Sequence, residues 1–122
     1  MLDRDHLTAA NTWALTFAQI ETAEAVANLD EILAVDWLDG VLLGPNDLAI
    51  SMRGDKEISA PEVLEVIEDV RARANAANKL TWAYANNAAF AETLVETGWK
   101  FVAIGSDIGW LRDGASAART MK

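Results

Sequence analysis

The sequence predicts an α/β protein made of four consecutive strand–helix units around a parallel sheet. Four short apolar segments at 13–21, 40–44, 80–84 and 101–105 are each followed by a helical pattern. Strict alternation of this kind is typical of parallel sheets, either doubly wound or closed into a barrel. A complete eight-unit barrel typically needs about 250 residues. The chain has 122 residues, which suits half of such a barrel.

Composition fits one folded domain over residues 1–122, with 52% hydrophobic residues. The net charge of −9 argues against a nucleic-acid partner, because such proteins usually present a basic face. The absence of cysteine excludes disulfides and thiolate metal sites. No apolar run approaches the roughly 18 residues of a membrane span, and no signal peptide is recognisable. We therefore expect a cytoplasmic protein without a membrane partner.

The first two units follow from apolar runs and capping signals. A short helix at 3–11 precedes the first expected strand, 13–21, which is apolar enough to be covered on both faces. Thr22 can cap the next helix, whose apolar residues recur at helical spacing. These residues are Val26, Leu29, Ile32 and Leu33. Asp39-Gly40 then marks the turn into the second strand, 40–44.

The last two units carry similar signals. Ser59-Ala60-Pro61-Glu62 matches the S-x-x-E capping box at the start of the clearest helix in the chain. Asn86-Asn87 offers a cap after the third strand, 80–84, and Gly98 is the expected helix stop. A final helix follows the fourth strand, 101–105.

Glu21 and Asp47 fall at the carboxyl ends of the first two expected strands, where α/β proteins keep their chemistry. Neighbouring parallel strands lie about 4.8 Å apart, so both carboxylates can reach one cation. Spacing alone leaves a structural alternative open, in which Glu21 is an acid at a helix start and Asp47 an N-cap. Tyr84, Asn86, Ser106 and Asp107 also follow strands and can line a pocket, although capping explains Asn86 and Asp107 equally well.

Three segments together resemble the HpcH/HpaI aldolase family of pyruvate-utilising, metal-dependent barrel enzymes. They are FAQIET, DGVLLGPNDLA and FVAIGSDIGWLR, in this order and at these separations, and the likeness runs from about Asp5 to the end. In that family they are the fifth to eighth strands with their loops. The resemblance therefore implies a half (β/α)8 TIM barrel.

The resemblance also implies a site. Glu21 and Asp47 match the metal-binding carboxylates of the family, and Gln19 matches the glutamine beside the bound oxo acid. The backbone amides of Asn46 and Asp47 match the loop that receives the substrate carboxylate. A turn that opens a helix directs N–H groups at an anion, in agreement with this role. The implied cofactor is a divalent ion, Mg²⁺ or Mn²⁺, with Co²⁺ as a further candidate.

The implied function is that of a class II pyruvate aldolase, a lyase that reversibly cleaves hydroxylated 2-oxo acids to pyruvate and an aldehyde. The general-base histidine, its acidic helper and the substrate arginine of the family match nothing in this chain. His6 reads as a surface residue, and Arg53, Lys100 and Arg112 match no catalytic position. The alternative is a catalytically incomplete half-barrel that serves as a folding or assembly unit. Unpaired edge strands favour a homo-oligomer in either case, whereas a nucleotide binder is disfavoured because no glycine-rich phosphate loop is present.

Overall fold

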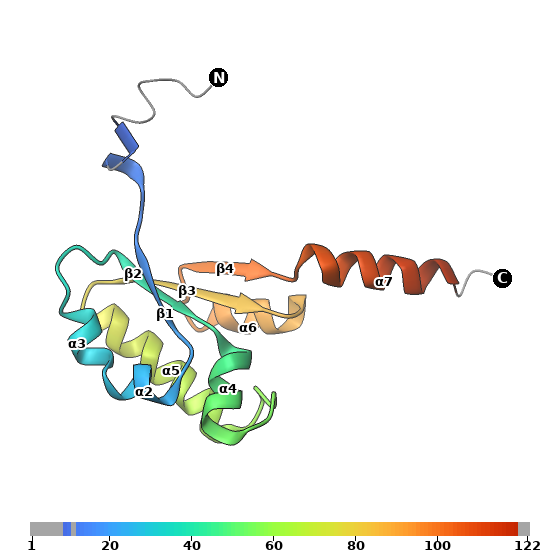
Figure 1. Cartoon of the computed structure of the whole chain (residues 1–122), viewed down its shortest axis with the longest axis horizontal. Helices are drawn as coiled ribbons and strands as arrows, with labels where there is room; N and C mark the ends of the chain where they lie inside the picture. The colour runs from blue at the N-terminus through green and yellow to red at the C-terminus, as the bar shows by residue number, and fades with distance from the viewer. Residues whose placement is uncertain (1–8, 11, 120–122) are drawn as a thin grey trace.

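Four parallel strands form the centre of the structure, a computed structural model that describes residues 9–10 and 12–119 (Figure 1). The strands lie side by side in the order β1-β2-β3-β4, so each pairs with its neighbour in the sequence. Their bounds are β1 Phe17–Ile20, β2 Gly40–Leu43, β3 Leu80–Ala85 and β4 Phe101–Ile104. The expected α/β class with four parallel strands is confirmed.

Helices cover one face of this sheet. Figure 1 shows α2 to α6 beneath the strands, while α7 extends away from the sheet. Their bounds are α2 Ala23–Ala27, α3 Leu29–Leu33, α4 Pro45–Arg53, α5 Pro61–Ala76, α6 Ala88–Glu96 and α7 Asp107–Arg119. No helix within 9–10 and 12–119 is both long and apolar enough to cross a membrane.

The core lies between the sheet and these helices. Because side chains alternate along a strand, every second residue of β3 is buried: Thr81, Ala83 and Ala85. Ala83 and Ala85 pack in one cluster with buried residues of the other strands and the helices, including Ile20, Val41, Leu43, Leu29, Leu48, Val63, Val70 and Leu94. Burial of this apolar surface is the main force that fixes the helices against the sheet.

The opposite face of the sheet carries an aromatic cluster. The ring of Phe17 meets Trp82 edge-on at a centroid distance of 5.5 Å, and Phe101 at 6.2 Å. Phe101 remains 45% exposed. The expectation that the first strand is covered on both faces is therefore wrong for the described part of the chain, whose helices cover one face. We call Phe17, Trp82 and Phe101 the open-face cluster.

Several local signals are confirmed. The Thr22 hydroxyl accepts a hydrogen bond from the backbone N–H of Ala25 at 3.0 Å, which caps α2. Asn87 caps α6 in the same way, accepting from the N–H of Phe90 at 2.9 Å. Gly98 follows α6 with a φ of 98°, a left-handed conformation that glycine adopts without steric strain.

Two element boundaries differ from expectation. Trp13 lies in a helical turn, and β1 begins only at Phe17. The preceding carbonyl, Thr16 O, accepts a hydrogen bond from the N–H of Gly40, the first residue of β2, at 3.3 Å. An apolar run alone does not show where its pairing partner begins. The helix expected after Thr22 is interrupted at Asn28, which ends α2 and starts α3. The sequence pattern runs through this break because both short helices face the same core.

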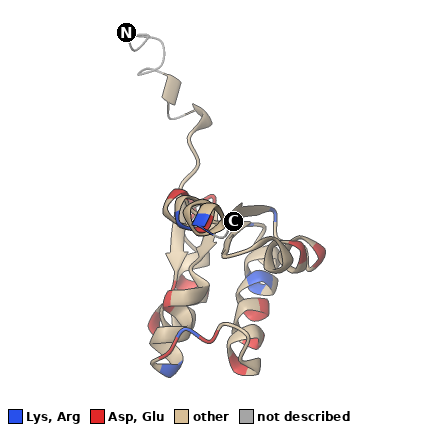
Figure 2. Cartoon of the chain, turned by 90° about the vertical axis from the view of Figure 1, so that its right-hand side faces the viewer, with Lys and Arg blue, Asp and Glu red and all other residues tan. Residues whose placement is uncertain are grey.

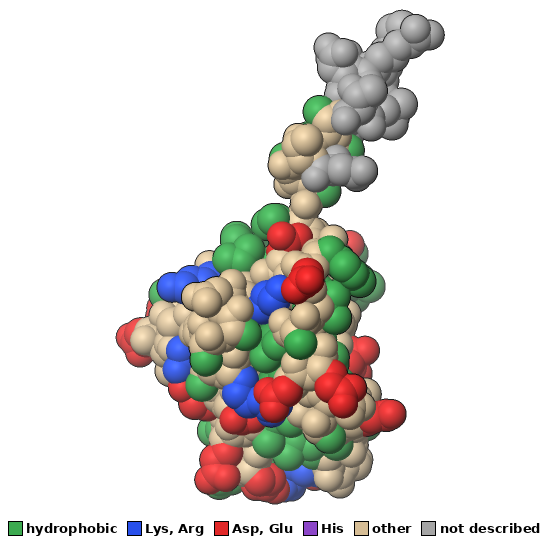
Figure 3. Space-filling model, turned by 90° about the vertical axis from the view of Figure 1, so that its left-hand side faces the viewer, with side chains coloured by type: hydrophobic (Ala, Val, Ile, Leu, Met, Phe, Trp, Pro, Cys, Tyr) green, Lys and Arg blue, Asp and Glu red, His purple; other side chains and the backbone are tan. Residues whose placement is uncertain are grey.

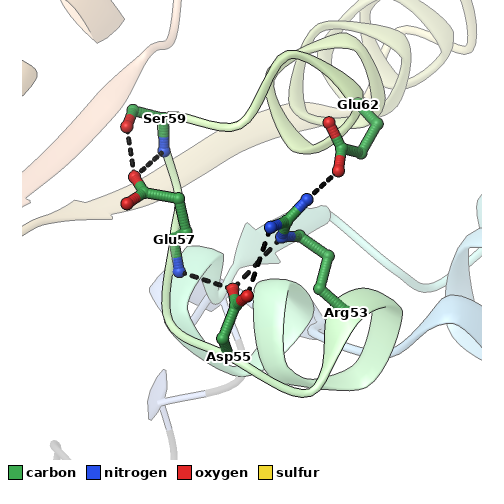
Figure 4. Close-up of polar contacts among 5 residues, drawn as sticks. All are labelled: Arg53, Asp55, Glu57, Ser59 and Glu62. Atoms are coloured by element: carbon green, nitrogen blue, oxygen red, sulfur yellow. Dashed lines mark hydrogen bonds and ion pairs between the residues drawn. The ribbon is translucent and has the colours of Figure 1, made fainter.

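The capping box expected at Ser59 and Glu62 is wrong. The N-cap of α5 is Ala60, which has no side chain able to accept a hydrogen bond. Figure 4 shows the reason: Ser59 donates to Glu57, and Glu62 forms an ion pair with Arg53. Arg53 also binds Asp55 at 3.1 Å, so one guanidinium joins the end of α4 to the start of α5. The same Arg53 hydrogen bond lowers the pKa of Asp55.

Charged residues lie on helices and loops and are absent from all four strands (Figure 2). On the face drawn in Figure 3, basic side chains are interspersed among acidic ones and do not form a continuous basic surface. Arg73 pairs with Asp30 at 2.7 Å and with Asp69 at 3.2 Å. The predicted surface residue His6 lies outside the described residues.

Candidate functional site

Gln19 and Glu21 meet at the carboxyl end of β1. Gln19 lies on the uncovered face of the sheet, in register with Leu42, and Glu21 follows the last residue of the strand. The Gln19 side-chain amide donates to Glu21 Oε2 over 2.5 Å. This hydrogen bond fixes one carboxylate oxygen and leaves the other oxygen of Glu21 available to a further partner.

Gly44 makes room for this pair. A Cβ at position 44 would lie 3.0 Å from Glu21 Cβ, 3.1 Å from Glu21 Oε2 and 3.4 Å from Gln19 Nε2. The N–H of Gly44 donates to Ile20 O at 3.1 Å, which ties the start of α4 to the end of β1. The missing side chain thus allows the Glu21 carboxylate to lie directly against the backbone that opens α4.

The first turn of α4 supplies the remaining predicted groups. Pro45 occupies its first position and is buried, and Asn46 and Asp47 follow it. The first N–H groups of a helix have no carbonyl partner within the helix. Gly44, the N-cap, has no side chain to satisfy them. The N–H groups of Asn46 and Asp47 are therefore suited to an anion, since the helix dipole also favours negative charge here.

A hollow of about 200 Å³ joins these groups. Its walls come from the ends of β1, β2 and β3 and the start of α4: Gln19, Leu42, Leu43, Gly44, Pro45, Asn46, Asp47 and Tyr84. The structure thus brings together Gln19, Asn46 and Asp47, and it places Glu21 beside them through the bond from Gln19. All four predicted site residues lie at the carboxyl ends of the strands.

A second hollow, about 570 Å³, lies next to the first and shares Tyr84 as a wall. Tyr84, Asn86 and Ser106, which the sequence places at strand ends, all line it. Asp107 instead starts α7, where its carboxylate accepts from the N–H of Ile108 at 2.8 Å. Sequence reasoning missed the contact of Asn86 with Asn46, two side chains 40 residues apart. Only the order of the strands could have indicated it.

Two carboxylates, those of Glu21 and Asp47, are the site's acidic donors for a divalent ion. Residues 9–10 and 12–119 contain no group of three or more acidic, histidine or cysteine side chains that could hold a metal. Glu21 and Asp47 offer two carboxylates, and hard ions such as Mg²⁺ are commonly bound through one or two carboxylates with water and substrate completing the shell. The pair fits an ion of this kind that shares its coordination with an oxo acid. It does not fit a closed structural metal site.

None of the described residues that line the smaller hollow is basic. Arg53 is engaged by Asp55 and Glu62, and Arg112 pairs with Asp113 at 3.2 Å while lining the second hollow. The site therefore depends on helix N–H groups, and on any bound cation, to attract an anionic ligand.

The sequence model of the family described as "HpcH/HpaI aldolase/citrate lyase" matches residues 4–114. The chain belongs to this family. It is 41% identical over 113 residues to the 4-hydroxy-2-oxo-heptane-1,7-dioate aldolase of Salmonella paratyphi B, a match that covers 93% of the chain and 43% of that enzyme. It is 38% identical over 112 residues to the hydroxypyruvate/pyruvate aldolase of Rhizorhabdus wittichii, covering 90% of the chain and 45% of the relative. Aldolases are thus among its relatives.

The fold agrees with this assignment. An HpcH/HpaI aldolase/citrate lyase family protein from Burkholderia cenocepacia superposes with a TM-score of 0.86 at 28% identity, over 97% of the chain and 46% of that structure. The HpcH/HpaI chain therefore spans about half the length of the relatives that it matches.

Proposed function

We propose that the chain carries the ion- and oxo-acid-binding part of a class II pyruvate aldolase, folded as a half (β/α)8 barrel over residues 1–122. The observation that carries the proposal is the placement of Gln19, Glu21, Asn46 and Asp47 at one edge of the sheet, around Gly44. The chain also belongs to a family that includes aldolases, which supports the same proposed function.

Each residue has a distinct role in this proposal. Glu21 and Asp47 hold Mg²⁺ or Mn²⁺, with Co²⁺ as a substitute, and Gln19 orients the Glu21 carboxylate through its 2.5 Å hydrogen bond. The N–H groups of Asn46 and Asp47 receive the carboxylate of an oxo acid such as pyruvate. The ion would supply positive charge beside the ketone oxygen, where negative charge develops when a carbon–carbon bond breaks.

The chain by itself is expected to be a poor aldolase. Cleavage needs a group that accepts the hydroxyl proton on the aldehyde side, and a positioned base typically contributes about 10²- to 10⁴-fold. Within 9–10 and 12–119, no histidine or arginine lines the smaller hollow. Proton exchange at the methyl group of pyruvate requires less, because only a methyl C–H bond breaks and re-forms, with solvent water accepting and returning the proton.

The test combines titration with exchange. Glu21→Gln and Asp47→Asn each remove a charge with little change in volume, so both should weaken Mn²⁺ binding in calorimetry while the fold is kept. In deuterated buffer the parent chain should exchange the pyruvate methyl protons slowly and only with metal, and Glu21→Gln should suppress this exchange. Glu24→Gln, in the exposed first turn of α2, is the matched control.

Two results would refute the proposal. Equal Mn²⁺ affinity in Glu21→Gln, Asp47→Asn and the parent chain would remove these carboxylates from the site. Efficient aldol cleavage by the purified chain would show that a base lies among residues not considered above. A cleavage assay with a separately supplied polypeptide bearing the first four strand–helix units of a full-length relative measures how much activity the chain can support.

A second candidate function, an assembly unit, is favoured by the open-face cluster and by α7. Phe17, Trp82 and Phe101 line a hollow to which none of the described helices α2 to α7 contributes a residue. Helix α7 has no buried residue, and its apolar residues Ile108 and Leu111 are both 76% exposed. Parallel strands β1 and β4 also leave unpaired backbone groups at the sheet edges. We propose that the chain self-associates, and that a second copy covers this face.

Sedimentation tests this assembly. The parent chain should be larger than a monomer at micromolar concentration, and Phe101→Lys should shift it towards the monomer, because a buried lysine without a partner is unfavourable. Trp37→Lys is the control, since Trp37 is 72% exposed in the turn before β2. A cooperatively folded, strictly monomeric parent chain would contradict the proposal.

A further inference from the structure

Two asparagine side chains form a reciprocal pair beside the site. Asn46 Nδ2 donates to Asn86 Oδ1 at 3.3 Å, and Asn86 Nδ2 donates to Asn46 Oδ1 at 3.2 Å. Asn46 lies in the first turn of α4, and Asn86 lies in the turn that follows β3. Each amide uses one donor and one acceptor in this pair, so both orientations are fixed at once.

The pair anchors the start of α4 on the side of β3. On the side of β1, the same turn is held by the bond from Gly44 N–H to Ile20 O at 3.1 Å. The first turn of α4 therefore rests between two attachments, one to each neighbouring strand end. Removing one attachment allows the turn to pivot about the other.

Asn86 has no capping role that would explain it. Its neighbour Asn87 caps α6, with its side chain accepting from Phe90 N–H at 2.9 Å. Asn86 is exposed and does not line the hollow formed by Gln19, Asn46 and Asp47. It lines the larger neighbouring hollow, and Tyr84 lines both. The hydrogen bonds of Asn86 connect it to the smaller hollow through Asn46.

We infer that Asn86 is a positioning residue for oxo-acid binding: through Asn46, it holds the N–H groups of Asn46 and Asp47 in the direction that a carboxylate requires. This inference rests on the function proposed above. Helix N–H groups bind an anion only when they converge on it, and displacement of a binding group by about 1 Å can reduce productive binding by up to roughly 100-fold. Glu21, on the β1 side, does not depend on this attachment, whereas Asp47 lies on the turn itself. Oxo-acid binding uses two N–H groups of that turn and ion binding uses one of its carboxylates, so oxo-acid binding should weaken more than ion binding.

The experiment uses the full chain and two affinities. Mn²⁺ affinity is measured alone by calorimetry, and pyruvate affinity is measured at saturating Mn²⁺. Asn86→Ala should weaken pyruvate binding by about tenfold, within the range expected for a misdirected group. It should weaken Mn²⁺ binding by a clearly smaller factor, because Glu21 keeps its position. Asn28→Ala, an exposed asparagine without a side-chain cap hydrogen bond, should leave both affinities unchanged.

A double-mutant cycle tests the route. If Asn86 acts through Asn46, then Asn86→Ala should have no further effect on pyruvate affinity in an Asn46→Ala background. Backbone amide resonances of Asn46 and Asp47 should shift in Asn86→Ala without ligand and stay in place in Asn28→Ala. A merely structural role would lower the denaturation midpoint without separating the two affinities.

The outcomes that overturn the inference are distinct. If the parent chain binds both ligands and Asn86→Ala binds pyruvate equally well, the positioning role is wrong while the proposed function stands. Additive effects in the cycle would show that Asn86 does not act through Asn46. A parent chain that binds neither Mn²⁺ nor pyruvate would overturn the proposed function, and the role of Asn86 with it.

Discussion

Substitution of Gly44 by alanine should damage the site while it leaves the fold nearly intact. The new methyl group would lie 3.0 Å from Glu21 Cβ and 3.1 Å from Glu21 Oε2, where ordinary contacts begin at 3.4 Å. Glu21 must therefore move by a few tenths of an ångström, close to the roughly 0.5 Å tolerance of a preorganised site. We expect Mn²⁺ affinity to fall about tenfold, which corresponds to about 1.4 kcal/mol.

Stability should change much less. Gly44 has a φ of −101°, which alanine adopts without strain. Alanine is a poorer N-cap than glycine, which lowers stability. Alanine also lowers the conformational entropy of the unfolded chain, which stabilises the folded state by about 0.4–1 kcal/mol. The two effects oppose each other, so the free energy of unfolding should stay within about 1 kcal/mol of the parent value.

The assay pairs calorimetric Mn²⁺ titration with urea denaturation. Gly114→Ala is the matched control, because nothing lies within 4 Å of a Cβ added there in the exposed α7. The control should bind Mn²⁺ as the parent chain does. If Gly44→Ala also keeps the parent affinity, while Glu21→Gln loses it, the close approach of Glu21 to Gly44 does not control the site.

Two further predictions concern the fold. Leu48→Ala removes a fully buried side chain of α4 and should lower the free energy of unfolding by about 2–5 kcal/mol in urea denaturation. Leu64→Ala is the control and should have a much smaller effect, because Leu64 is 42% exposed. Equal effects of the two substitutions would contradict the core described above. Hydrogen bonds from Arg53 and Arg71 lower the pKa of Asp55 and Glu68, so the stability from these pairs is complete above about pH 4–4.5 and is lost as pH falls through the lowered values. Glu68→Gln should therefore flatten the loss of stability on acidification, and an unchanged pH profile would refute this contribution.

The sheet could be predicted well because its signals are local. Each strand is a short apolar run bounded by turn or capping residues, and Thr22, Asn87 and Gly98 act as their types predict. The shared location of Glu21 and Asp47 could be predicted from the parallel arrangement alone, since the carboxyl ends of parallel strands lie together on one side of the sheet.

The errors came from competition between local and distant partners. Ser59 and Glu62 match a capping box in sequence, yet Glu57 and Arg53 take their hydrogen-bonding groups. The apolar run at Trp13 could not reveal where β2 begins, and that position sets the start of β1. The pairing of Asn46 with Asn86 joins two separate strand–helix units, so no short-range pattern encodes it.

The strand order β1-β2-β3-β4 makes the architecture modular. Chain order and spatial order coincide, so each strand–helix unit docks on the unit made immediately before it, and no segment must thread between two others. Such a sheet can be lengthened at either edge by whole units without rearranging those already in place. Fusing further βα units of a relative to the β1 edge, or to the β4 edge, would thus preserve every backbone pairing between the existing strands. The four strand–helix units thus form a block to which whole units can be joined at either edge strand.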